Sequence, residues 1–320
     1  MKFNLDTAWK DASRLLSRNL GLLAVVAGVF FFLPYAGVAM ALPEMGDLQA
    51  AQASGNFDLM AAAASDLYAS YWWLFLVLAI IQGIGLLAML ALVRQRANPT
   101  VGEALAAGGR SVLSYIAAQL LQVALIVFVA VLLTAIGALT GLQALAVLGG
   151  IVAFVVTCYI VVKLSLVAPV IAIEGERNPV RALRRSWTLT RGQSFRLFLF
   201  YLLLLVAFMV LSVVITLVLG LPFALAGEQA ALLGEGVLSG LVNAVMVVVA
   251  VCVLAVVHTL RHEGDLALTY LRRAIDLNPD NRTLARQEPD FEPLRRELAF
   301  RQAVEPPPTP RRRSRGRTPR

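Results

Sequence analysis

The sequence predicts an all-α polytopic membrane protein with six transmembrane helices and both termini on the cytoplasmic side. Composition is the first reason: 59% of the residues are apolar and 15% are charged, whereas a soluble domain has roughly 25% charged residues. Second, the apolar residues form six continuous runs, each able to supply the about 20 residues of a spanning helix. Third, the basic residues between these runs fall only in alternate connections.

The six predicted spans lie at residues 19–42, 71–93, 112–137, 142–162, 196–220 and 237–260. Helices are favoured over a barrel because the apolar residues are continuous rather than alternating, and because a helix satisfies its own backbone groups in lipid. Ala39 and Ala41 offer a signal-peptide cleavage motif. We nevertheless expect an uncleaved first span, since the apolar run is longer than the roughly 7–15 residues of a signal peptide.

The distribution of charge predicts the orientation. Lys and Arg in the connections occur before span 1, between spans 2 and 3, between spans 4 and 5, and after span 6. The other three connections contain no basic residue, and they lie at 43–70, 138–141 and 221–236. Because cytoplasmic loops carry the excess of basic residues, we expect the first group of connections and both termini to be cytoplasmic.

The segments that precede spans 1, 3 and 5 resemble one another. When they are aligned, each has a small residue at two positions four apart. These pairs are Ala8 and Ala12, Ala104 and Gly108, and Ala182 and Ser186. The pattern predicts three copies of one unit, an amphipathic interfacial helix followed by a transmembrane hairpin.

The stretch from Lys163 to Gly192 is the most unusual part of the chain. Span 4 is expected to end near Lys163, whose amine can reach the headgroups. Pro169 lacks a backbone donor and is expected to break or kink a helix. We therefore interpret the apolar residues after Lys163 as a re-entrant or interfacial piece that returns Glu174 to the membrane surface. A turn and a further helix follow, and Gly192 is placed to cap the end of that helix.

Charged and aromatic side chains in this stretch form a candidate contact site for a lipid headgroup or a partner protein. Its residues are Lys163, Glu174, Arg181, Arg184, Arg185 and Trp187. In one interpretation the guanidinium groups cradle a phosphate, and Glu174 pairs with Lys163 at the membrane boundary. In the other, the arginines set the topology and pair with Glu174 and Glu176.

The run from Leu166 to Gly192 resembles the signature of the glycerophosphoryl diester phosphodiesterase membrane-domain family and its relatives among uncharacterised bacterial inner-membrane proteins. The matching residues are Pro169, Glu174, Ala182, Leu183, Arg185, Ser186, Trp187, Leu189, Thr190 and Gly192. The likeness covers about residues 1–262, the predicted membrane domain. It implies the bacterial inner membrane. The chain after span 6 is too short for the catalytic (β/α)₈ barrel of fused members, so no phosphodiesterase activity is implied.

The chain after the membrane domain is expected to contain a short cytoplasmic helical segment at 263–303. Ala267, Leu271, Ala274 and Pro279 have the spacing of the second helix of a tetratricopeptide repeat. This segment is interpreted either as a capping piece of that type or as an amphipathic helix with coincidental spacing.

Residues 304–320 are expected to form a disordered tail rich in Pro and Arg, with six arginines among its last ten residues. Such a tail is either simply solvated or attracted to anionic lipid. Without interleaved aromatic residues it does not predict specific nucleic-acid binding.

No catalytic motif or cofactor site is recognised in the sequence, so an enzyme is not expected. His258 and His262 lie one helical turn apart, but no third ligand is nearby, and we predict no metal site. The expected function is a non-catalytic membrane module, a cytoplasmic-side scaffold or anchor for a partner protein or an anionic lipid. The alternative is a transporter of a lipid or small solute, which would have a polar cavity reached by Gln119 or Asn243.

Overall fold

The computed structural model describes residues 5–42, 44–93, 99–139, 143–288, 291, 295 and 298–305. The chain forms two compact units. We call Phe3–Thr259 the membrane unit and the part from Leu260 onward the C-terminal unit. Each unit is described by itself.

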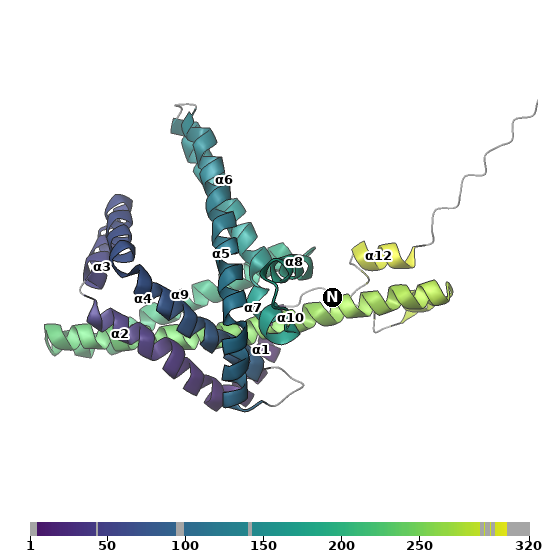
Figure 1. The fold of residues 1–320 in the computed structure, drawn as a ribbon, viewed down its shortest axis with the longest axis horizontal. Helices are drawn as coiled ribbons and strands as arrows, with labels where there is room; N and C mark the ends of the chain where they lie inside the picture. The colour runs from purple at the N-terminus through teal and green to yellow at the C-terminus, as the bar shows by residue number, and fades with distance from the viewer. Residues whose placement is uncertain are drawn as a thin grey trace, which may run out of the picture. The chain divides into compact units, whose positions relative to one another are not determined.

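The described residues contain helices and turns but no strand. In chain order, the elements up to the unit boundary are α1 (Leu5–Ala27), the π-helix η1 (Gly28–Phe32), α2 (Leu33–Ala41), α3 (Glu44–Ser54), α4 (Phe57–Leu92), α5 (Val101–Leu139), α6 (Gln143–Leu164), α7 (Val167–Pro169), the π-helix η2 (Val170–Glu174), α8 (Pro179–Leu189), α9 (Ser194–Leu225) and α10 (Glu228–Leu277), which continues past it. Figure 1 shows their course.

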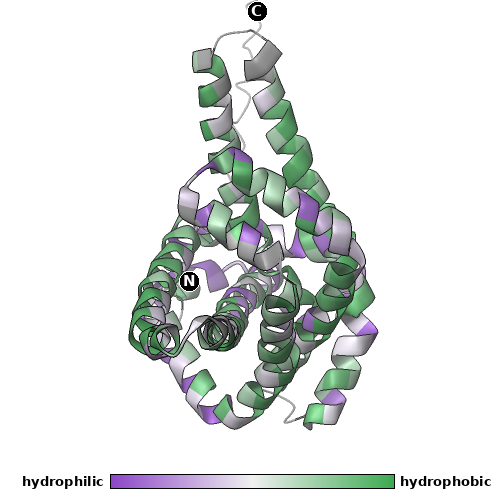
Figure 2. Ribbon diagram, turned by 90° about the vertical axis from the view of Figure 1, so that its left-hand side faces the viewer, coloured by the Kyte–Doolittle hydropathy of each residue, from purple (hydrophilic) through white to green (hydrophobic). Residues whose placement is uncertain are grey.

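Six helical segments of the described chain are long and apolar enough to cross a membrane. They are Asp6–Ala41, Phe57–Leu92, Val101–Ala135, Val147–Glu174, Ser194–Phe223 and Leu233–Leu277. Hydrophobic residues dominate the long helices (Figure 2), and many of their large hydrophobic side chains are exposed. The predicted all-α class and the six spans are therefore confirmed. The helices extend beyond the apolar runs because the backbone hydrogen-bond ladder continues through neighbouring polar residues that also form helices well.

Small residues allow the spanning helices to approach closely. The helices α5 and α6 lie side by side (Figure 1). A Cβ atom added to Gly149 of α6 would lie 2.8 Å from the Leu133 carbonyl oxygen of α5. Gly85 of α4 leaves room for the side chain of Phe30 in η1, and Gly234 of α10 leaves room for the side chain of Phe223 in α9. Each consecutive pair of spans in the predicted repeat is thus in contact, as small interfacial residues permit.

The predicted threefold register agrees with the pattern of burial. All six aligned small residues are buried; they are Ala8, Ala12, Ala104, Gly108, Ala182 and Ser186. The copies differ in continuity, since α1 and α5 run on into their spans whereas α8 is separate from α9. Gly192 follows α8 with φ +81°, a conformation that ends a helix. In the other two copies the equivalent positions are Arg18 and Ser114. Residues with a side chain rarely adopt a positive φ, so the helix does not end there in these copies.

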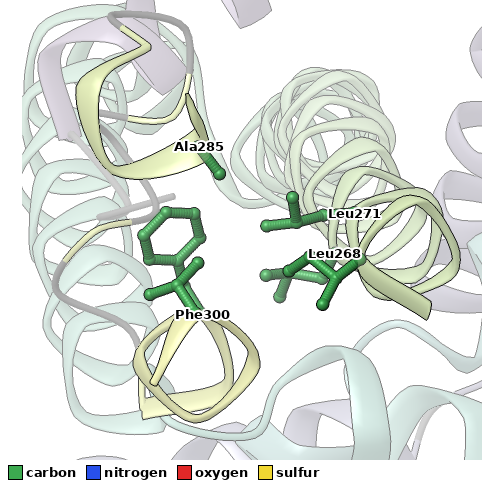
Figure 3. Close-up of a cluster of buried hydrophobic side chains, with 6 residues drawn as sticks. Leu268, Leu271, Ala285 and Phe300 are labelled. Carbon is green, nitrogen blue, oxygen red and sulfur yellow. The ribbon is translucent and has the colours of Figure 1, made fainter. Parts of the chain in front are cut away.

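The C-terminal unit has its own small apolar core, formed by the end of α10 together with α11 (Asn281–Gln287) and α12 (Leu298–Val304). The core residues are Leu268, Leu271, Ile275, Ala285, Phe300 and Val304, four of which are labelled in Figure 3. Leu271 occupies one of the tetratricopeptide-like positions, and Ala267 packs against the core from another. The predicted Pro/Arg-rich tail lies outside the described residues, apart from Val304 and Glu305.

Candidate functional site

The fourth spanning segment is interrupted between α6 and α7. Leu164 is the last residue of α6, and Val167 is the first of α7. Between them, Leu166 has φ −91° and ψ 10°, and its carbonyl accepts the first hydrogen bond of the resumed helix, from the amide of Val170 at 3.0 Å. Pro169 falls in the first turn, where amide groups have no intrahelical acceptor. The predicted break is present, but it lies before Pro169 rather than at it, because proline is tolerated in a first turn.

The hydroxyl of Ser186 bridges this interruption. Its Oγ donates to the carbonyl of Lys163 at 2.8 Å and accepts from the amide of Leu166 at 3.2 Å. The hydroxyl oxygen of Thr190 lies 3.3 Å from the same Lys163 carbonyl. Ser186 and Thr190 are both fully buried. One side chain of α8 thus provides a partner for a backbone carbonyl on one side of the break and for a backbone amide on the other.

The start of α8 is defined by local capping chemistry. Gly175 adopts φ +76° and turns the chain after η2. The side chain of Asn178 then accepts hydrogen bonds from the amides of Val180 and Arg181, at 3.0 and 3.2 Å. Pro179 is the first helical residue, where its fixed φ favours the helix and its missing donor has no cost. These features agree with the predicted turn.

The two faces of α8 have different environments. Ala182, Ser186 and Leu189 are buried, at spacings of four and three residues that place them on one face. Arg181 and Arg184 are exposed on the opposite face. The helix therefore packs on α5, α6 and α7 through small and apolar side chains and directs two arginines outward.

Glu174 is the centre of a polar cluster at the end of η2. The two carboxylate oxygens accept from Nε of Arg185 at 3.1 and 3.3 Å, and Oε1 lies 2.9 Å from Nε2 of His258. The side chains of Glu174, Arg185 and His258 are 20%, 28% and 2% exposed. The contact with Arg185 agrees with the interpretation of these arginines as structural partners. The expected pairing of Glu174 with Lys163 stays a prediction.

Sequence reasoning missed the role of His258. This residue is 84 positions away from Glu174, and the sequence offered only its spacing from His262 as a signal. A more useful signal was its position within the last apolar run, where a polar side chain needs a partner. In the structure that partner is the carboxylate that ends η2.

The amine of Lys163 lies over two aromatic rings. Its Nζ atom is 5.3 Å from the ring centroid of Trp187 and 5.5 Å from that of Tyr159. The two rings meet edge to face, with centroids 5.9 Å apart. Lys163 is only 3% exposed, and cation–π attraction compensates in part for the loss of hydration. Tyr159 was not among the predicted contact residues, because nothing in its local sequence distinguishes it from a lipid-facing aromatic residue.

These contacts divide the predicted contact residues into three sets. Glu174 and Arg185 form an ion pair, Lys163 and Trp187 form a cation–π pair, and Arg181 and Arg184 remain on the exposed face of α8. The first two sets hold the interrupted span in place. The third is positioned to bind an anionic group from outside.

A separate concavity of about 550 Å³ lies between α3 and α4. Its lining residues are Asp47, Ala50, Ala51, Ser54, Leu59, Ala62, Ala63, Asp66 and Leu67. Neither Gln119 nor Asn243 contributes to it. The amide of Gln119 donates instead to the hydroxyl of Tyr115 on the same helix, at 3.1 Å.

The all-helical fold, the six helices able to span a membrane and the interrupted span define a multi-pass α-helical membrane protein. Residues 4–262 match the model of a family described as "Domain of unknown function (DUF7847)", and the chain belongs to that family. No curated protein and no solved structure matches the chain. None of these comparisons links the chain to the glycerophosphoryl diester phosphodiesterase membrane domain, so that resemblance stays a prediction.

Proposed function

We propose that the protein is a non-catalytic membrane module whose α8 surface serves as a scaffold or anchor for an anionic lipid or a partner protein. The observation that supports this proposal is the division of α8 into two faces. Its inner face is occupied by contacts that support the interrupted span, and its outer face presents Arg181 and Arg184. Arginine is well suited to bidentate recognition of phosphate or carboxylate.

The position of α8 between two spans supports contact with the membrane surface. The fourth spanning segment ends at Glu174, and α8 follows from Pro179 to Leu189. The next spanning helix, α9, begins at Ser194. By the charge rule, this connection lies on the cytoplasmic side of what we propose is the bacterial inner membrane.

The chemistry of the polar side chains favours a non-catalytic role. The hydroxyl of Ser186 donates to a backbone carbonyl and accepts from a backbone amide, so it is engaged as a structural bridge. The carboxylate of Glu174 is held by Arg185 and His258. A catalytic nucleophile instead needs an adjacent base and an open position for the reacting atom.

Site-specific photo-crosslinking in cells tests this proposal. A benzophenone amino acid replaces Thr188, which is exposed on α8, and the control probe replaces Gln52, which is exposed on α3. We expect a lipid or protein adduct at Thr188 that is absent at Gln52 and is lost when Arg181 and Arg184 are both changed to Gln. Equal labelling at the two probe positions would contradict an anchor on α8. So would adducts at Thr188 that still form when Arg181 and Arg184 are both changed to Gln.

The alternative function is transport of a lipid or small solute. The observation in its favour is the interrupted span, because discontinuous helices with charged groups at the break form the binding sites of many transporters. Lys163 lies beside the break, and Glu174 and His258 meet at the end of the same spanning segment. Translocation of a fluorescent phospholipid or a radiolabelled solute in proteoliposomes tests this alternative. A transporter would be favoured over an anchor if translocation is faster than in protein-free liposomes and if Glu174→Gln abolishes the difference.

A further inference from the structure

We infer that the ligand of the α8 surface is a single anionic phospholipid, bound with its phosphate on Arg181 and Arg184 and one acyl chain along α6. This inference rests on the proposed function and names the chemical class of its ligand. It follows from two surfaces of the membrane unit that meet at Trp187.

The first surface is the basic face of α8. Trp187, Arg184 and Arg181 follow one another at intervals of three residues, so they are neighbours along one side of the helix. No ion pair or hydrogen bond engages the guanidinium group of Arg181 or of Arg184 among the residues that the structure describes. Arg185, by contrast, already pairs with Glu174. The outer face therefore keeps two uncompensated positive charges, which favours an anionic headgroup over a zwitterionic one.

The second surface is an apolar stripe on α6. Leu148, Val152, Val155 and Tyr159 are all exposed, at spacings of four, three and four residues that place them on one face of the helix. With a rise of about 1.5 Å per residue the stripe is roughly 16 Å long. That length matches one leaflet of a hydrocarbon core about 30 Å thick, and so the extent of one acyl chain.

The two surfaces are joined where Tyr159 meets Trp187. Their rings are in edge-to-face contact at 5.9 Å, and Tyr159 is the last residue of the stripe on the side of α8. Tyrosine and tryptophan prefer the boundary between hydrocarbon and headgroups. The phosphate of a lipid lying on the stripe would thus be level with the arginines of α8. A soluble phosphate could use only the arginines, whereas a phospholipid uses both surfaces.

Native mass spectrometry of the full chain, released from nanodiscs of defined composition, tests this inference. Wild type is compared in phosphatidylglycerol and in phosphatidylcholine with the double variant Arg181→Gln/Arg184→Gln. The matched control is Arg18→Gln/Arg196→Gln, which removes the same charge from exposed positions outside α8. Thermal unfolding of each protein checks that the variants fold.

We expect wild type and the control to retain one phosphatidylglycerol and little phosphatidylcholine. The double variant is expected to lose at least about tenfold in preference for the anionic lipid, because a hydrogen bond from arginine to a charged phosphate contributes a factor of about ten or more. The control keeps both of these donors. Millimolar glycerol 1-phosphate is expected not to displace the lipid, since it cannot occupy the stripe.

Three outcomes would overturn the inference: equal retention of the two lipids, an equal loss in the control, or displacement by glycerol 1-phosphate. If one of these occurs while an arginine-dependent protein adduct still forms at Thr188, the anchor function stands with a protein as its ligand. If that adduct is also insensitive to the arginines, the proposed function fails together with the inference.

Discussion

Replacing Ser186 with Ala is expected to destabilise the membrane unit by about 2–4 kcal/mol. The amide of Leu166 would lose its acceptor at 3.2 Å, and a buried unpaired donor costs about 1–3 kcal/mol. The carbonyl of Lys163 would lose its donor at 2.8 Å. The Thr190 hydroxyl stays 3.3 Å away and can turn to this carbonyl from the nearer Ser186 carbonyl at 3.0 Å, so we expect a smaller loss there, about 1 kcal/mol. Alanine leaves almost no cavity, so the lost hydrogen bonds dominate.

The assay is reversible unfolding of the purified protein in mixed micelles, followed by circular dichroism as the fraction of denaturing detergent increases. Thr188→Ala is the matched control, because this hydroxyl bonds to the Arg185 carbonyl of its own helix on the exposed face. It is expected to change the free energy of unfolding by no more than about 0.5 kcal/mol. If Ser186→Ala and Thr188→Ala have the same effect, the Ser186 hydroxyl does not support the interrupted span.

The same unfolding assay checks three further predictions. Gly108→Ala is expected to destabilise by about 1–3 kcal/mol, because its Cβ would lie 2.7 Å from a backbone carbonyl of α4. Gly109→Ala, with nothing within 4 Å, is expected to be neutral or to stabilise by up to about 1 kcal/mol; equal effects would contradict close packing of α4 and α5. Pro169→Ala is expected to destabilise by about 1–3 kcal/mol, since it adds a buried amide in a first turn. A gain in stability would instead indicate a proline in a helix interior. Glu174→Gln is expected to cost about 1–3 kcal/mol by weakening the contacts with its arginine and histidine partners. Glu176→Gln, in an exposed turn, is expected to change the free energy of unfolding by no more than about 0.5 kcal/mol. Similar losses in the two glutamate variants would argue against a specific role for the Glu174 cluster.

Most of the fold was predictable because its determinants are local. Hydropathy alone located all six spans, since a spanning helix must be apolar over its whole length. The turn at Gly175 and the helix end before Gly192 were also predictable, because both glycines adopt positive φ angles that other residues avoid. The exact site of the break was not predictable. Proline is compatible with a first turn as well as with a kink, and only the backbone at Leu166 distinguishes the two.

The candidate site was predictable in its residue types but not in its contacts. The sequence indicated Glu174 and the arginines as one candidate contact site, and Ser186 only as part of the family motif and of the repeated small-residue pattern. It did not indicate that Ser186 bonds to the backbone on both sides of a helix break. Nor did it indicate that His258 completes the Glu174 cluster.

From the sequence by itself, the membrane class, the number of spans, the spacing of the small residues and the capping of α8 could be determined. All of these depend on hydropathy, helical periodicity or backbone preferences within a few residues. Only the tertiary structure decided which side chains meet: Ser186 with the break, Glu174 with Arg185 and His258, and Lys163 with its two aromatic rings. The physical reason is that these contacts form between separate helices, whose relative rotation and depth are set by packing rather than by the order of residues along the chain.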